Sequence, residues 1–125
     1  MQETTYRGET NDYGQPSGFG VFISENFDYR GEFLAGLPHG VGVLQSSSGV
    51  DYKGFFQFGQ PNGIGEMTTA DDVIYSGAWD RGTYRGPLPR AQVEHVIDTS
   101  ERAAIVAEKH ARNAEDDDDD SGPSM

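Results

Sequence analysis

A Tyr-x-Gly triplet returns four times at a constant interval of 23 residues, and this period restricts the fold more than any other feature of the 125-residue chain. The four copies begin at Tyr6, Tyr29, Tyr52 and Tyr75. A fixed period of this length indicates a repeat array, in which one supersecondary unit is stacked on the next. Repeat arrays mostly present an extended surface to partners, so the period favours a binding protein over an enzyme.

The internal pattern of each copy predicts a β-hairpin. In the second copy Tyr29, Gly31 and Phe33 alternate, and alternate residues of a strand share one face. Segment 36–40, Gly-Leu-Pro-His-Gly, reads as the turn, and Gly42 opens the second strand. A helix is excluded because each glycine in a helix interior costs about 1 kcal/mol. The chain is therefore predicted to be mostly β, an elongated twisted antiparallel sheet of consecutive hairpins.

The first and last copies depart from this pattern. Thr10 stands where the other copies carry an aromatic residue, and Leu88 replaces the second glycine of the fourth copy, with Pro87 and Pro89 on either side. Atypical ends are expected of the repeats that cap an array. We therefore expect about four copies, of which two are regular.

Composition divides the chain into three segments. All 14 aromatic residues lie between Tyr6 and Tyr84, so residues 1–88 are predicted to form the array. Residues 89–114 carry equal numbers of basic and acidic residues and are predicted to be helical. Residues 115–125 hold six carboxylates, a like-charge run that predicts a disordered acidic tail.

The helical segment has its own periodicity. Small and aliphatic residues recur at steps of three and four from Val93 to Ala114, which is one helical face. Asp98-Thr99-Ser100-Glu101 resembles a capping box, so we expect the helix over residues 99–113 and leave 91–97 unassigned. This helix either packs on the array and caps it or docks on another protein.

Charge and composition exclude several classes of function. The net charge of −12 argues against sequence-independent binding of nucleic acid and disfavours docking on an anionic membrane surface. The chain has no cysteine, no signal-peptide pattern and no apolar run of bilayer length. We therefore expect a cytoplasmic protein.

No pattern in the chain indicates catalysis, a cofactor or a metal. The glycines of segment 36–42 lack the Lys-Ser/Thr and the helix of a phosphate-binding loop, and they recur in the other copies. His39, His95 and His110 show no ligand spacing. The acidic run at 116–120 lacks the spaced ligands of a calcium loop and reads as a solvated tail. We expect a non-enzymatic protein without cofactor or metal.

The repeat resembles the MORN family (membrane occupation and recognition nexus), whose pattern is approximately Tyr-x-Gly-x-Phe/Trp-x-x-Gly-x-x-x-Gly-x-Gly. The resemblance covers roughly residues 6–86, and copies two and three match at every position. It implies a twisted sheet with an aromatic-lined groove and scaffolding roles, frequently at cytoskeletal structures, cilia and membranes. The C-terminal Ala103-Ala104-Ile105-Val106 and Ala111-Arg112-Asn113 also resemble retinophilin-type MORN proteins, a group associated with unconventional myosin tails.

The function predicted from these features is a scaffold or adaptor. Its aromatic groove would bind a segment of a larger cytoskeletal protein, ciliary, flagellar or myosin-type. The alternatives are a permanent structural subunit of an axonemal assembly and a peripheral membrane-targeting module, and a homodimer through the terminal strands is a further expectation. Aromatic residues would supply apolar contact and two basic residues would set register. The predicted partner-binding residues are Tyr29, Phe33, Tyr52, Phe56, Tyr75, Trp79, Arg30 and Lys53.

Overall fold

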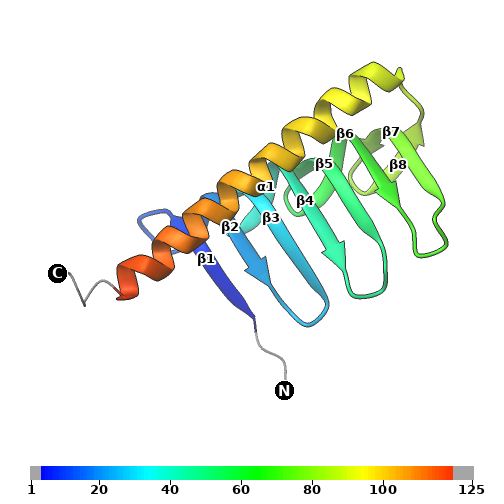
Figure 1. Ribbon diagram of the computed structural model, residues 1–125. Coiled ribbons are helices and arrows are strands. Elements are labelled where there is room, and N and C mark those ends of the chain that lie inside the picture. The colour runs from blue at the N-terminus through cyan, green and yellow to red at the C-terminus, as the bar shows by residue number, and fades with distance from the viewer. Residues whose placement is uncertain (1–3, 120–125) are drawn as a thin grey trace.

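The protein is a single antiparallel sheet with one long helix on one of its faces. The computed structural model describes the backbone of residues 4–119 and the side chains of residues 4–113. The sheet contains eight strands in sequence order, each paired with the next. The strands are β1 (Thr5–Thr10), β2 (Pro16–Ile23), β3 (Phe27–Leu34), β4 (Leu37–Ser46), β5 (Asp51–Gln57), β6 (Gln60–Thr68), β7 (Ile74–Asp80) and β8 (Thr83–Gly86), and the helix is α1 (Arg90–Asp119). The predicted mostly β fold of consecutive hairpins followed by a C-terminal helix is confirmed (Figure 1).

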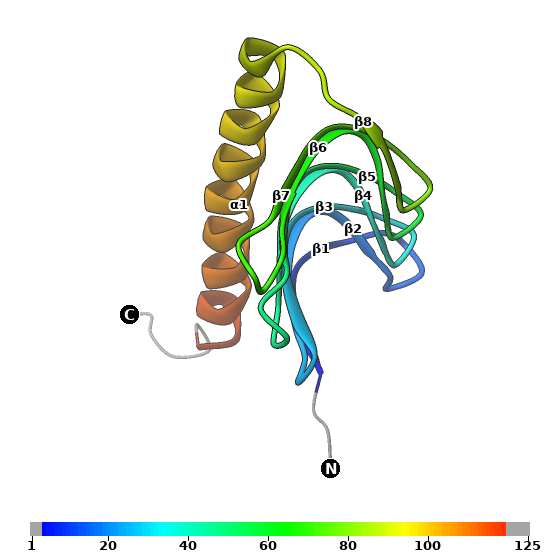
Figure 2. The same ribbon diagram turned by 90° about the vertical axis from the view of Figure 1, so that its right-hand side faces the viewer.

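The sheet is strongly curved, and α1 lies along its convex side. Figure 2 shows the strands bending away from the helix, so that the opposite face forms a trough. The helix contacts β1 to β6 and runs across the strands rather than along them (Figure 1). The convex face is therefore largely covered by this chain, whereas the concave face is not.

A row of glycines crosses the sheet where it bends. The strand register aligns one glycine from each of seven strands, and these residues are Gly8, Gly20, Gly31, Gly42, Gly54, Gly65 and Gly77. A Cβ on Gly42 would lie 2.2 Å from the hydroxyl oxygen of Tyr29, and one on Gly65 would lie 2.0 Å from that of Tyr52. The glycines thus leave room for tyrosine rings to lie directly on the backbone of the next strand.

The hairpin turns are shorter than the sequence predicts, and the expectation of a turn over residues 36–40 is wrong. The turn consists of Ala35 and Gly36, both with positive φ (49° and 93°), and β4 already begins at Leu37. Two-residue turns with positive φ at both positions match the right-handed twist of the flanking strands. Consequently Gly40 and Gly42 lie inside β4 and are part of the strand rather than of the turn.

The helix begins nine residues earlier than expected. The Pro89 carbonyl accepts the N–H groups of Gln92 and Val93, so α1 starts directly after the proline-rich linker. The predicted capping box at residues 98–101 is therefore wrong: Ser100 is fully buried against the sheet, and the Thr99 hydroxyl donates to the His95 carbonyl inside the helix. Burial of the first helical turns on the sheet overrides the local capping signal.

The predicted apolar face of the helix is confirmed at Val93, Val96, Ser100, Ala107 and Ala111, which are buried. At the middle of the face Ala103 is buried, whereas Ala104, which the sequence pattern places there, is partly exposed. The helix continues to Asp119, into the acidic run that the sequence predicts to be disordered. The remainder of that predicted tail, residues 120–125, lies outside the described residues.

Replacing Gly42 by alanine should destabilise the fold by about 2–3 kcal/mol, because the added methyl group overlaps the Tyr29 ring. Urea denaturation followed by tyrosine and tryptophan fluorescence measures this loss. Gly14→Ala is the matched control, since Gly14 has positive φ but nothing within 4 Å of the new Cβ, and about 1 kcal/mol is expected there. Equal losses for the two variants would show that ring contact on the glycine row is unimportant.

Candidate functional site

Five of the six predicted aromatic residues form one continuous cluster on the concave face. Tyr29 packs edge-on against Phe33 and Phe56, in both cases with ring centroids 5.0 Å apart. Tyr52 makes the same contact with Phe56 at 5.0 Å and with Trp79 at 5.5 Å. Edge-to-face pairs of this kind add about 0.5–1.5 kcal/mol beyond the area that they bury. The aromatic residues of successive repeats therefore interlock along the trough.

These five rings are buried, and the sixth is not. Tyr29, Phe33, Tyr52, Phe56 and Trp79 are each less than a tenth exposed, so they form the core that holds the hairpins together. Tyr75 is 40% exposed near the β8 end of the sheet. Of the predicted aromatic site residues, Tyr75 is thus the one with a ring most open to a partner.

The open part of the concave surface comes from residues that the sequence analysis did not select. They are partly buried and pack against the aromatic core, and they comprise Tyr6, Phe22, Phe27, Leu44, Met67 and Tyr84. Phe22, Leu44 and Met67 occupy the same position of the second strand in successive repeats, directly opposite Tyr29, Tyr52 and Tyr75. Their recurrence once per repeat along the chain is the sequence signal from which they could have been predicted.

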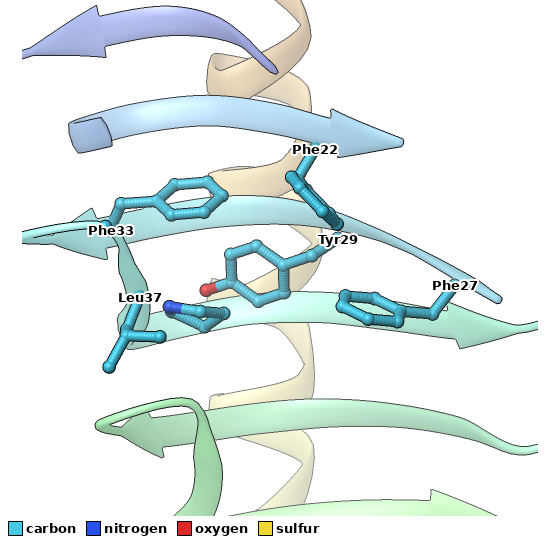
Figure 3. A pocket seen from close by; sticks show the side chains of 7 residues that line it. Phe22, Phe27, Tyr29, Phe33 and Leu37 are labelled. Atoms are coloured by element: carbon cyan, nitrogen blue, oxygen red, sulfur yellow. The ribbon is translucent and has the colours of Figure 1, made fainter. Parts of the chain in front are cut away.

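A pocket of about 150 Å³ opens on this surface across β2, β3 and the start of β4. Figure 3 shows Phe22, Phe27 and Phe33 around Tyr29, with Leu37 at the rim. Pro38 and Gly36 complete the lining. An apolar cavity of this size accommodates a group as large as benzene, so one aliphatic or aromatic side chain of a partner would fit.

Arg30 and Lys53 do not lie beside the aromatic residues. They project from the convex face, where Arg30 pairs with Glu108 of α1 and Lys53 pairs with Glu101 at 2.6 Å. A third ion pair joins Arg90 of α1 to Glu66 on β6 at 2.7 Å. The two basic residues predicted to orient a partner are thus engaged in holding the helix on the sheet.

The helix and the array share a common spacing. Glu101 and Glu108 are seven residues apart on α1, a rise of about 10.5 Å, and their partners lie two strands apart, about 9.6 Å. One heptad of the helix therefore spans one repeat of the sheet. This match explains how a straight helix contacts the same position of successive repeats.

Three tyrosine hydroxyls are held above the glycine row. Tyr29 donates to the Glu32 carbonyl at 2.9 Å and Tyr52 donates to the Phe55 carbonyl at 3.0 Å. Burial raises the pKa of both phenols well above their usual range, and burial, with a smaller contribution from the Glu9 charge, raises the pKa of Tyr6 to about 12. All three phenols therefore stay neutral in the folded protein at physiological pH.

The comparison with known families finds MORN repeats in this chain. The family model matches three segments, residues 12–28, 29–50 and 52–72. Among curated proteins no relative matches the chain, so the resemblance to retinophilin-type proteins has no support from a homologue.

MORN repeats are typical of protein-binding or membrane-associated repeat proteins, and the family is typically non-enzymatic. Within the described residues no group of three His, Asp or Glu side chains is placed to hold a metal ion. In the same part of the chain, no helix is long and apolar enough to cross a bilayer. The concave face of the sheet presents partly buried apolar residues and a pocket of about 150 Å³.

The buried tyrosines make the fold sensitive to alkali. Because their folded pKa values exceed the unfolded value of about 10, their contribution to stability is complete below pH 10 and is lost as the pH rises toward 12 and above. The melting temperature should therefore fall steeply above pH 10. Absorbance at 295 nm, which reports phenolate, should rise together with unfolding rather than before it.

Tyr29→Phe provides the control for this pH dependence, since it keeps the ring on Gly42 and removes one buried phenol. Its melting temperature should fall less between pH 10 and pH 12 than that of the unaltered protein. An identical decline in the two proteins would show that the Tyr29 phenol does not contribute to the alkaline transition.

Proposed function

We propose that the protein is a non-enzymatic adaptor whose concave face binds an apolar segment of a partner protein. The observation that carries this proposal is the difference between the two faces of the sheet. The chain's own helix covers the convex face, whereas the concave face holds partly exposed apolar residues and a pocket of about 150 Å³. Exposed apolar surface lining a concavity is typical of an interaction site.

The roles of the predicted residues differ within this proposal. Tyr29, Phe33, Tyr52, Phe56 and Trp79 build the floor of the trough, since they are buried in the free protein. Direct contact with the partner would come from Tyr75 together with Phe22, Phe27, Leu44 and Met67. Arg30 and Lys53 would act indirectly, because they fix α1 on the opposite face.

A protein partner is favoured over a membrane surface by charge. The chain carries 21 acidic and 9 basic residues, and three of the basic side chains in the array or at its linker are paired with acidic ones across the convex interface. Anionic lipid attracts clusters of lysine and arginine, which the concave face lacks at its strand positions. We further propose a cytoskeletal partner, such as a ciliary, flagellar or motor protein, on the resemblance to MORN scaffolds.

The test uses two exposed concave residues, because substitution of the buried ones would unfold the array. The double variant Tyr75→Ser, Leu37→Ser should keep the melting temperature within a few degrees and lose the partner. Affinity purification from ciliated cells, followed by calorimetry with the recovered partner segment, measures binding. At least a ten-fold loss of affinity is expected when two apolar anchors are removed.

Ile105→Ser is the matched control, since Ile105 is an equally large and exposed apolar residue on the outer side of α1. Binding should be unchanged in this variant. Retention of the partner by the concave double variant, or its loss in the Ile105 variant alone, would place the site elsewhere. Sedimentation with anionic vesicles at low salt should show no association, and strong association would favour the membrane alternative.

A further inference from the structure

The two ends of the sheet are built differently. Beyond β8 the chain leaves the sheet through Pro87, Leu88 and Pro89, and Pro87 packs against the backbone at Gly77. Proline has no N–H to donate to a neighbouring strand, so the segment that would continue this edge cannot pair. At the other end, no described residue pairs with the outer edge of β1. Within the described residues, β8 is thus a four-residue edge strand that ends in prolines, and the outer edge of β1 has no paired strand.

The outward groups of β1 follow from the hydrogen bonds of β2. Phe19 donates its N–H to the Glu9 carboxylate on β1 at 2.7 Å, so Phe19 faces β1 and its neighbour Gly20 faces β3. Gly8, which lies opposite Gly20, therefore directs its own N–H and C=O away from the sheet. Tyr6 and Thr10 share this direction because residues alternate along a strand. Three residues of β1 present backbone donors and acceptors to a further strand.

The helix is longer than the sheet that it covers. Glu9 of β1 lies 3.9 Å from His110 of α1, and Thr5 and Arg7 line one cavity with Ala111 and Arg112, so β1 lies near residues 110–112 of the helix. The helix continues to Asp119, about 12 Å further, which corresponds to roughly two more strand spacings. Figure 1 shows this end of α1 projecting past β1. The helix therefore extends over the place where a strand added to β1 would lie.

We propose that the outer edge of β1 accepts one antiparallel strand from another protein, of the type formed by the second strand of a MORN repeat. The sequences of the internal strands indicate which residues the added strand would need. Opposite each Tyr-x-Gly strand lies a strand of the form Gly-x-apolar, as in Gly42-Val43-Leu44 opposite Gly54, Lys53 and Tyr52. An added strand would likewise place a glycine opposite Gly8, an aliphatic residue opposite Arg7 and an apolar residue opposite Tyr6. Pairing of this kind is β-augmentation.

The source of this strand is a different chain rather than a second copy of this one. The β8 strand of another copy has only 4 residues before the two prolines, fewer than the 8, 10 and 9 residues of β2, β4 and β6, which disfavours head-to-tail growth. Pairing of β1 with β1 of a second copy would bring together two projecting helix ends whose sequences, residues 115–119, consist of carboxylates. Like-charge repulsion disfavours that arrangement. The fitting partner is a protein that ends in an unblocked Gly-x-apolar strand.

A synthetic peptide with the sequence of residues 37–46, Leu-Pro-His-Gly-Val-Gly-Val-Leu-Gln-Ser, tests the proposal on the full-length protein. The peptide should bind at β1, and amide hydrogen exchange measured by NMR should slow at Tyr6, Gly8 and Thr10. Val41 donates its N–H to Glu32 on β3, so Gly42 and Leu44 are the peptide residues whose N–H groups would face β1. N-methylation at these two positions should weaken binding at least about ten-fold.

Two further controls complete the experiment. Thr10→Pro, which removes one outward N–H at a position where an edge strand tolerates proline, should weaken binding of the unmodified peptide without changing the melting temperature greatly. A peptide of residues 83–89, which contains the two prolines, should not bind. Equal affinity for the N-methylated peptide, protection at amides outside β1, or no binding at all would overturn the proposal. So would a dimer of the protein alone that already protects Tyr6, Gly8 and Thr10.

Discussion

The contact of a tyrosine ring with a glycine on the next strand is the interaction on which the rest of this structure depends. A thin sheet has no second layer to bury its aromatic residues, and the glycine row lets each ring lie directly on backbone instead. The ring then meets the aromatic residues of its own and the following repeat edge-on, at centroid distances of about 5 Å. One core is thus built from side chains that belong to successive hairpins, and a single repeat could not form it.

On the convex face, α1 supplies the second layer that covers the sheet. Its buried side is composed mainly of alanine and valine, which allows the helix to lie close to the sheet, and ion pairs from Arg30, Lys53 and Glu66 fix its register. Because seven helical residues rise about as far as two strands of the sheet, equivalent positions of α1 meet successive repeats. A sequence with a different helical period would lose the match within a few turns.

Much of the fold was predictable because it follows from local periodicity. The 23-residue period and the alternation of Tyr29, Gly31 and Phe33 gave the hairpins, their sequence order and the shared aromatic face. The turn at Ala35 and Gly36 was not predicted, since a left-handed alanine has no signature in composition. The start of the helix at Arg90 was also missed, because it depends on burial of Val93 and Val96 against the sheet rather than on a capping residue.

The candidate site was harder to predict than the fold, for a physical reason. Aromatic residues are the obvious candidates in such a sequence, yet the strongest of them, Tyr29 and Tyr52, are needed inside. Basic residues at the second position of the triplet look available, but a strand points them to the face opposite their tyrosine neighbours. Which face a partner meets was decided by the position of α1, and that position depends on contacts between distant segments.

The contact of α1 with six of the eight strands also determines how the protein loses its structure. In an array where each repeat touches only its neighbours, the ends fray independently and stability is a sum over adjacent pairs. The helix contacts β1 and β2 as well as β5 and β6, so it joins the first and third repeats, which are not neighbours in the sheet. Opening any one of them would strain the same helix, so we expect the array to unfold as one cooperative unit rather than repeat by repeat.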